Sequence, residues 1–284
     1  MALPNVIIAG QGKSGTSTLY EVLKAHPEAF VPLRKETGFL SYPEQFFYGE
    51  PFYERNYFRE YNGEKIIVDT HSSIMFFPEN PRNIFELLGP EVKFVFTLRD
   101  PIIRALSHYD MALLQLRESL SFKEAVRREA HRYSVAPKVR EGMSYIGRGY
   151  YASQIESFLE YYPKEQMYFM IFEEEITQNQ LESLIGLYDF LGIDPDLGIQ
   201  EPIARNSSKK SLKFSYNGDT LSFAGKRYIS PSPELVARAE FASNHYKEKL
   251  EPGYERSIYQ VFYADEIERL EGLIGRDLSA WKRS

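Results

Sequence analysis

The sequence predicts an α/β protein: a three-layer sandwich in which helices cover both faces of a central parallel sheet. Strand-like apolar runs alternate with helix-like amphipathic runs from residue 5 to residue 191. The strand-like runs are mostly apolar at consecutive positions, as expected for strands that are buried on both faces. Polar residues follow several of these runs, at the strand ends where open parallel sheets bind ligands.

The elements follow in order along the chain. Strands are expected at residues 5–9, 29–31, 65–69, 93–98 and 166–172. Helices are expected near residues 16–26, 80–88, 102–115, 121–132, 150–162 and 179–191. The stretch 201–233 is rich in Ser, Lys, Gly and Pro, and we expect a loop there that orders over a bound ligand like a lid. All of this is compatible with a single domain over residues 1–284.

The composition excludes several classes of protein. With 43% hydrophobic and 26% charged residues, the chain can bury an ordinary globular core. A net charge of −6 argues against a general nucleic-acid binder. The chain has no cysteine for disulfides or thiolate metal sites, and no apolar run approaches the roughly 20 residues of a membrane span. We expect a cytoplasmic enzyme, or a catalytic module of a longer protein.

The most informative segment is Gly10-Gln11-Gly12-Lys13-Ser14-Gly15-Thr16-Ser17-Thr18-Leu19. A strand, a Gly-rich turn and a helix start bring backbone N–H groups and a positive helix end to one point. Lys13 adds a point charge, and hydroxyls add further donors. A Walker A loop would need glycine at position 7, which is Ile7. The segment therefore predicts a cradle for a phosphate-like anion that differs from the Walker A type.

A second anion grip is expected after the strand at 93–98. Arg99 stands at the end of that strand, and Pro101 suits the first turn of the next helix. Ser107 then lies about two turns into the helix, on the same side as Arg104. An arginine and a hydroxyl in this arrangement suit the binding of a phosphate group.

Together the two segments resemble those of the sulfotransferase family. In that family a loop reading roughly Gly-x-x-Lys-Ser/Gly-Gly-Thr-Thr/Ser-x-Leu holds the 5′-phosphosulfate of the donor, and an Arg-Asp/Asn-Pro…Arg…Ser-x-Tyr motif holds its 3′-phosphate. The similarity extends over most of the chain, through Gly149-Tyr150 to the C-terminal Gly275-Arg276-Asp277-Leu278. It implies a P-loop-kinase-like sulfotransferase fold.

The resemblance also implies the ligand and the residues that bind it. The donor would be 3′-phosphoadenosine 5′-phosphosulfate, which leaves as adenosine 3′,5′-bisphosphate, and no metal is required. The implied binding residues are Gly12, Lys13, Ser14, Gly15, Thr16, Ser17, Arg99, Ser107, Tyr150, Lys209 and Lys210. Lys13 would stabilise the charge that develops on the leaving phosphate.

Two residues compete as the base that accepts the acceptor's proton. Glu36, in Arg34-Lys35-Glu36-Thr37-Gly38-Phe39, matches the position of the base in the glycan sulfotransferases that this chain resembles. The alternative interpretation is that Glu36 only forms a solvated salt bridge with one of the two basic residues before it. His71 follows the strand at 65–69, where relatives more often read Glu-Lys-Ser/Thr-Pro, and a histidine suits proton transfer. A structural histidine is the other reading of this position.

The resemblance leaves the acceptor open. A glycan hydroxyl and a carrier-bound β-hydroxyacyl chain fit equally well, and an amine fits less well. The dense aromatic stretch 39–61 is either a binding wall for such an acceptor or packing over the sheet edge, and packing is favoured. Two rival functions remain: an ATP-dependent small-molecule kinase, and a non-catalytic module that binds adenosine bisphosphate.

Overall fold

In the computed structural model, the described residues are 2–132, 134, 137–203 and 212–283. They divide into two compact units. The first, the sheet unit, comprises Met1–Asp100, Tyr150–Arg205 and Glu266–Leu278. The second, the helical unit, comprises Pro101–Gly149, Asn206–Asp265 and Ser279–Ser284. A single sulfotransferase domain over the whole chain remains a prediction.

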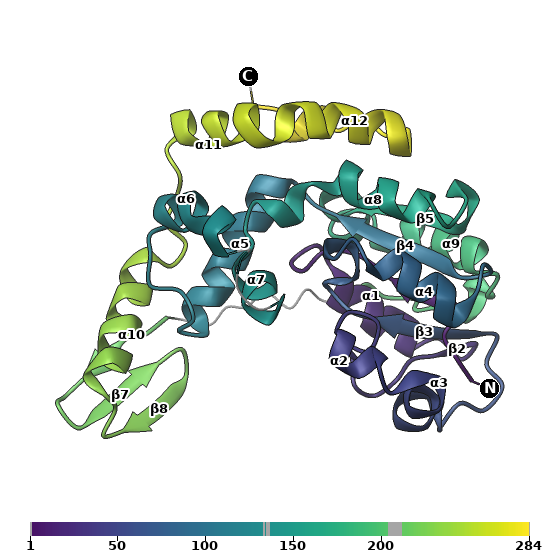
Figure 1. The fold of residues 1–284 in the computed structure, drawn as a ribbon, viewed down its shortest axis with the longest axis horizontal. Coiled ribbons are helices and arrows are strands. Elements are labelled where there is room, and N and C mark those ends of the chain that lie inside the picture. Colours follow the sequence, from purple (N-terminus) through teal and green to yellow (C-terminus); the bar gives the residue numbers. More distant parts are fainter. Residues whose placement is uncertain (1, 133, 135–136, 204–211, 284) are drawn as a thin grey trace. The chain divides into compact units, whose positions relative to one another are not determined.

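The sheet unit is built on five parallel strands in the order β2-β3-β1-β4-β5 (Figure 1). Their bounds are β1 Val6–Ile8, β2 Ala29–Phe30, β3 Ile66–Thr70, β4 Lys93–Leu98 and β5 Met167–Ile171. The helices of this unit are α1 Thr16–Lys24, α2 Pro43–Phe46, α3 Gly49–Tyr53, α4 Asn80–Leu88, α8 Tyr151–Leu159, α9 Gln180–Leu191 and most of α12 Ala264–Ile274. All five predicted strands are confirmed.

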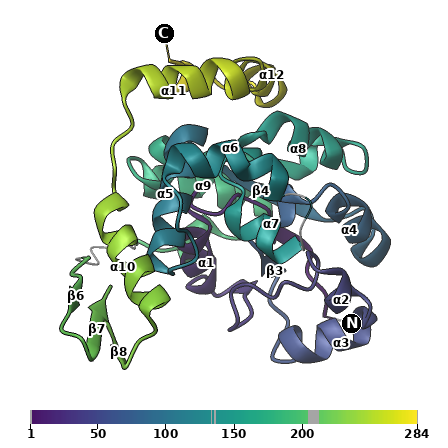
Figure 2. The ribbon, with the colours of Figure 1, turned by 60° about the vertical axis from the view of Figure 1, so that its left-hand side comes forward.

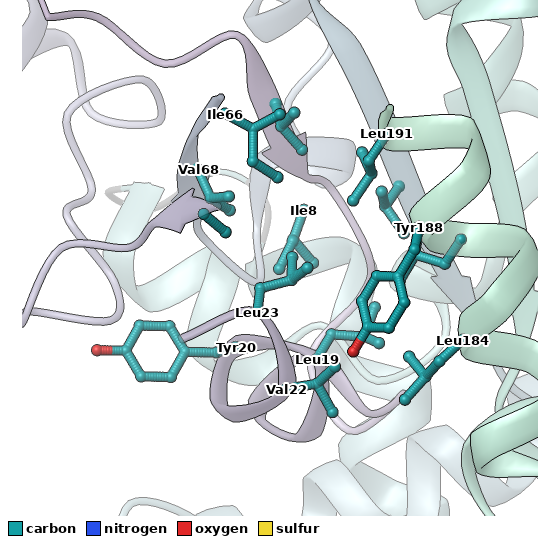
Figure 3. Packing of buried hydrophobic residues seen from close by; sticks show 14 of the residues in the cluster. Ile8, Leu19, Tyr20, Val22, Leu23, Ile66, Val68, Leu184, Tyr188 and Leu191 are labelled. Carbon is teal, nitrogen blue, oxygen red and sulfur yellow. The ribbon is translucent and has the colours of Figure 1, made fainter. Parts of the chain in front are cut away.

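Helices cover both faces of this sheet. On one face, α1 and α9 bury Leu19, Leu23 and Leu191 against strand residues such as Ile8 and Val68 (Figure 3). Aromatic side chains cover the other face, where rings of α8 and the turn after it pack on β4 (Phe94–Phe158, Phe96–Phe158 and Phe94–Tyr162). Because successive strand residues point to opposite faces, apolar residues at every position are needed to fill both layers. The predicted three-layer sandwich is confirmed.

The aromatic stretch 39–61 forms α2, α3 and the π-helical turn Glu54–Phe58, which the coarse sequence reading missed. Phe39, Tyr53 and Phe58 are fully buried, so packing accounts for much of the stretch. Phe47 and Tyr48 are instead 86% and 60% exposed. The stretch is therefore divided between the core and the surface.

The helical unit contains α5 Pro101–Leu114, α6 Phe122–Arg132, α7 Pro137–Met143, α10 Pro233–His245 and α11 Pro252–Ile258. It also holds a small antiparallel sheet of β6 Ser215–Tyr216, β7 Thr220–Phe223 and β8 Lys226–Ile229, beside which α10 runs (Figure 2). The expectation of a loop over 201–233 is thus wrong for residues 215–229. Gly218 and Gly225 adopt φ values of 93° and 78°, as turn residues of hairpins do, and the sequence reading took them for loop. The lid-like role of 201–233 remains a prediction.

No helix in the described part of the chain is long and apolar enough to cross a membrane. A cytoplasmic location remains a prediction from the sequence.

Candidate functional site

The carboxyl ends of the parallel strands lie at one edge of the sheet, and four predicted site residues follow them. Lys13 comes after β1, Glu36 after β2, His71 directly after β3, and Arg99 directly after β4. All four belong to the sheet unit. Their positions beyond the strand ends agree with the sequence, and their roles in a site remain predictions.

The loop between β1 and α1 has the conformation that an anion cradle needs. Lys13 has a φ of 76° and Gly15 a φ of 99°, and Gly15 is the N-cap of α1. A non-glycine residue in the left-handed region costs about 1–3 kcal/mol, so the surroundings must hold Lys13 there. A side chain at Gly10 would place its Cβ only 1.7 Å from the Thr97 Oγ1, so only glycine lets the loop start against β4. The loop is therefore bent sharply over the sheet edge.

The loop carries hydrogen-bond donors of the kind that bind phosphate and sulfate oxygens. The N–H groups in the first turn of a helix have no partner within the helix, and Thr16 and Ser17 stand in that turn. The Ser14 Oγ is buried and has no hydrogen-bond partner among the described residues. Since an unpaired buried hydroxyl is costly, an anion accepting from this loop would be favourable. The residues present fit a phosphate or phosphosulfate group.

Arg99 joins the loop to the neighbouring strand ends. Its Nη1 donates to the Lys13 carbonyl oxygen at 3.1 Å, and its guanidinium lies 4.5 Å from the centre of the Phe172 ring. Its Nε is 3.5 Å from the Glu173 Oε1. Burial raises the pKa of the Glu173 carboxyl, and the charge of Arg99 acts in the opposite direction. Arg99 thus holds the backbone of Lys13 in its strained conformation, a role that the sequence did not indicate.

Lys35 links the loop to the candidate base. Its Nζ donates to the Ser17 Oγ at 2.8 Å, and it lies 3.4 Å from both the Thr16 Oγ1 and the Glu36 Oε1. The side chains of Lys35 and Glu36 are 25% and 41% exposed. The expected contact between Glu36 and a neighbouring basic residue is present, but that residue also contacts the loop. The sequence indicated Lys35 only as a neighbour of Glu36, since no local pattern shows that its side chain reaches Ser17.

His71 has a different environment. Its side chain is buried, and its Nδ1 forms a 2.7 Å hydrogen bond with the Ser41 Oγ. The ring also packs edge-on against Tyr42, with ring centres 5.4 Å apart. These contacts are those of a structural histidine, which was one of the two readings of this position.

A buried carboxylate network lies beneath the segment that carries Glu36. The Asp69 Oδ2 accepts hydrogen bonds from the Thr37 Oγ1, at 2.9 Å, and from the Tyr53 hydroxyl. The Tyr57 hydroxyl donates to the Thr37 carbonyl oxygen at 3.3 Å. Burial raises the pKa of the Asp69 carboxyl, whereas the hydrogen bonds from Tyr53 and Thr37 lower it. The network fixes Thr37, the residue directly after Glu36. In the sequence, the polar Asp69 near the end of an apolar strand was the only sign of this network.

The other predicted ligand-binding residues belong to one or the other unit or lie outside the described residues. Ser107 is half-buried in α5 of the helical unit, and Tyr150 is the half-buried N-cap of α8 in the sheet unit. Lys209 and Lys210 lie outside the described residues. The roles of all four remain predictions. Among the described residues, no group of carboxylates and histidines could hold a metal ion.

Comparison with known proteins identifies relatives of the chain. The family model described as "Sulfotransferase domain" matches residues 3–223. Mouse heparan sulfate glucosamine 3-O-sulfotransferase 3B1 is 28% identical over 191 residues, which cover 67% of this chain and 46% of the mouse protein. The chain thus spans about half the length of the curated relatives it matches.

Solved structures agree with the family match. The crystal structure of a sulfotransferase from Alicyclobacillus acidocaldarius is 26% identical, covers 99% of each chain and superposes with a TM-score of 0.73. The sulfotransferase domain from the curacin biosynthetic pathway is 15% identical, covers 98% of this chain and 100% of its own, and has a TM-score of 0.52. At that identity the second likeness shows the fold alone. The chain belongs to the sulfotransferase family, whose enzymes use 3′-phosphoadenosine 5′-phosphosulfate as donor.

Proposed function

We propose that the site at the sheet edge transfers the sulfuryl group of 3′-phosphoadenosine 5′-phosphosulfate to a hydroxyl of an acceptor. The observation that carries the proposal is the joined pair of anion-binding elements. The loop with Lys13 and the strand-end Arg99 are hydrogen-bonded to each other through the Lys13 carbonyl oxygen. The sulfuryl donor carries one anionic group at the 3′ position of its ribose and another at the 5′ position, so its binding requires two anion-binding elements.

In the proposed reaction the acceptor oxygen attacks the sulfur atom in line with the bond that breaks. A new S–O bond forms to the acceptor, and the electron pair of the old S–O bond stays on the bridging oxygen of the leaving phosphate. Lys13 stabilises the charge that develops there. The acceptor's hydroxyl proton passes to the Glu36 carboxylate. Orientation and charge stabilisation carry most of the rate enhancement, as in phosphoryl transfer.

Glu36 is favoured over His71 as the base. A base must come within hydrogen-bond reach of the acceptor hydroxyl. The Glu36 side chain is 41% exposed and one of its oxygens lies 3.4 Å from the Lys35 Nζ, beside the loop. His71 is buried, with its Nδ1 bonded to Ser41. His71 remains the alternative, and a base at either position also separates the enzyme from a non-catalytic module.

The proposed acceptor is a glycan hydroxyl or the β-hydroxyl of a carrier-bound acyl chain. The curated relatives are named as enzymes that sulfate glucosamine of heparan sulfate at the 3-O position. For this chain their names support an oxygen acceptor over a nitrogen acceptor. Offering both acceptor types to the protein with radiolabelled donor sulfate identifies which one becomes labelled.

A thermal-shift titration tests the donor. Adenosine 3′,5′-bisphosphate stabilises the folded state with the logarithm of its concentration once that exceeds the dissociation constant, and by about 2.7 kcal/mol at 100 times that constant. ATP with Mg²⁺ gives much less stabilisation at the same concentration. Equal stabilisation by the two ligands would overturn the proposal and favour the kinase.

Ser107→Ala is the suitable variant for the 3′-phosphate, because Arg99 also holds the loop backbone. It weakens binding of adenosine 3′,5′-bisphosphate and leaves that of adenosine 5′-phosphosulfate unchanged. Equal losses for the two ligands would remove Ser107 from the proposed site.

A further inference from the structure

We propose that Lys35 is a positioning residue of the transfer site: it orients the hydroxyls of the anion-binding loop and holds Glu36 beside them. The inference rests on the proposed function, because it assigns a role to a residue in the same site. It concerns a side chain that the sequence indicated only as a salt-bridge partner for Glu36.

The number of N–H donors on the Lys35 ammonium group equals the number of side-chain oxygens near it. A lysine ammonium carries three N–H groups and no acceptor. The Lys35 Nζ has three oxygens near it: the Ser17 Oγ at 2.8 Å, and the Thr16 Oγ1 and Glu36 Oε1 at 3.4 Å each. Two of these oxygens belong to the first turn of α1 and the third to the candidate base. One cation therefore bridges the two parts of the site.

The direction of these bonds determines what the hydroxyls can do. When the Ser17 oxygen accepts a hydrogen from Lys35, its own hydrogen must point elsewhere. No acceptor for the Ser17 or Thr16 hydroxyl hydrogen is present among the residues that the structure describes. Both hydroxyls stand where α1 begins, and a helix N-terminus attracts anions. Lys35 thus leaves these hydrogens available to the oxygens of a bound phosphate or sulfuryl group.

The same contact places a positive charge beside the hydroxyls of the loop. Lys35 is three-quarters buried, so solvent screens it less than a surface lysine. Its neighbour Arg34 is exposed and forms no ion pair or hydrogen bond among the described residues. Arg34 therefore provides a matched control: it has the same charge, is adjacent in the sequence and lacks the contact.

The experiment measures dissociation constants by isothermal titration calorimetry for wild type, Lys35→Met, Arg34→Met and Ser17→Ala. Two ligands are used: adenosine 3′,5′-bisphosphate, and adenosine 3′-monophosphate, which lacks the 5′ group that the loop holds. For the bisphosphate, Lys35→Met raises the constant about ten-fold, Ser17→Ala about five-fold and Arg34→Met less than about two-fold. For the monophosphate, none of the variants differs from wild type by more than about two-fold, because the loop contacts are not used.

A double-mutant cycle tests whether Lys35 acts through the hydroxyl. If it does, Lys35→Met combined with Ser17→Ala raises the constant about ten-fold, well short of the roughly fifty-fold product of the single effects. Arg34→Met combined with Ser17→Ala shows no such coupling. Lys35→Arg keeps a charged donor and restores affinity to within about three-fold of wild type. This variant also provides the test if Lys35→Met does not fold.

The outcomes separate the two proposals. Wild type that binds neither ligand overturns the proposed function and this inference with it. A second outcome would overturn only the role of Lys35. Wild type would bind the bisphosphate, but Lys35→Met would change the dissociation constant no more than Arg34→Met does, or its effect would be additive with that of Ser17→Ala. Equal losses for both ligands would show a general disturbance of the fold, and would also overturn it.

Discussion

Two segments at the same sheet edge, residues 34–38 after β2 and residues 69–73 at the end of β3, have opposite characters. The first carries Lys35 and Glu36, which are partly exposed and bonded to the loop or to each other. The second carries Asp69 and His71, which are buried and bonded to other side chains of the core. Neighbouring strand ends thus differ in role: under the proposed function the first presents groups to a ligand, whereas Asp69 of the second fixes Thr37.

The physical reason lies in what burial does to polar groups. A buried carboxylate such as Asp69 must take hydrogen bonds from its surroundings, and Thr37 and Tyr53 supply them. Those same bonds hold the start of the segment after Glu36. A group that must accept a proton from a substrate has to remain reachable, as Glu36 is.

The largest expected effect is on the rate of sulfuryl transfer, and it distinguishes the two candidate bases, Glu36 in the first segment and His71 in the second. Glu36→Gln lowers the single-turnover rate of sulfuryl transfer about 10²–10⁴-fold, the usual loss for a general base, and leaves affinity for adenosine 3′,5′-bisphosphate within about two-fold. His71→Gln lowers the rate less than about ten-fold. The rates are measured at saturating donor and acceptor. The reverse pattern would make the buried histidine the base, and wild-type rates in both variants would exclude the two together.

The second prediction concerns the buried network. Tyr53→Phe removes the hydroxyl that donates to Asp69 and lowers the free energy of unfolding by about 1.5–3 kcal/mol, the range for a hydrogen bond to a charged group. Tyr57→Phe is the matched control. It removes a hydroxyl that donates to a neutral carbonyl at 3.3 Å and costs less than about 1 kcal/mol. Urea unfolding measures both, and equal costs would mean that Asp69 has no special need of Tyr53.

A smaller effect is expected at the contact of His71. Ser41→Ala removes the partner of the His71 Nδ1 and costs about 1 kcal/mol of stability. Under the proposal that Glu36 is the base, it leaves the transfer rate unchanged. A large rate loss with little loss of stability would instead place this pair in the reaction.

The smallest effect appears in the pH dependence of stability. Burial raises the pKa of Asp69 above its usual value of 3.8, so the folded state binds more protons than the unfolded state between the two pKa values. Stability contributed by this group is present at low pH and falls as the pH rises from about 4 through the folded pKa. Asp69→Asn removes this slope. Parallel stability curves for wild type and variant between pH 4 and 7 would contradict the raised pKa.

Much of the fold was predictable because local sequence and tertiary structure agree in the sheet unit. Strand β4 occupies the predicted residues 93–98, and α4 occupies the predicted 80–88. The helices at 43–53 and 233–245 were missed. Residues 43–53 are short and dominated by aromatics, which gives no clear helical period. The hairpin strands at 215–229 were missed because each is short and turn residues such as Gly218 and Gly225 separate them.

The sequence by itself determined the family, the order of the strands along the chain and the anion loop, since each of these depends on residue types at short spacings. Only the tertiary structure decided that Lys35 bonds to Ser17, that Arg99 holds the Lys13 carbonyl, and that Asp69 supports Thr37. These pairs are 18, 86 and 32 residues apart in the chain. They meet because parallel strands bring their carboxyl ends to one edge, and no local pattern encodes which side chains then face each other.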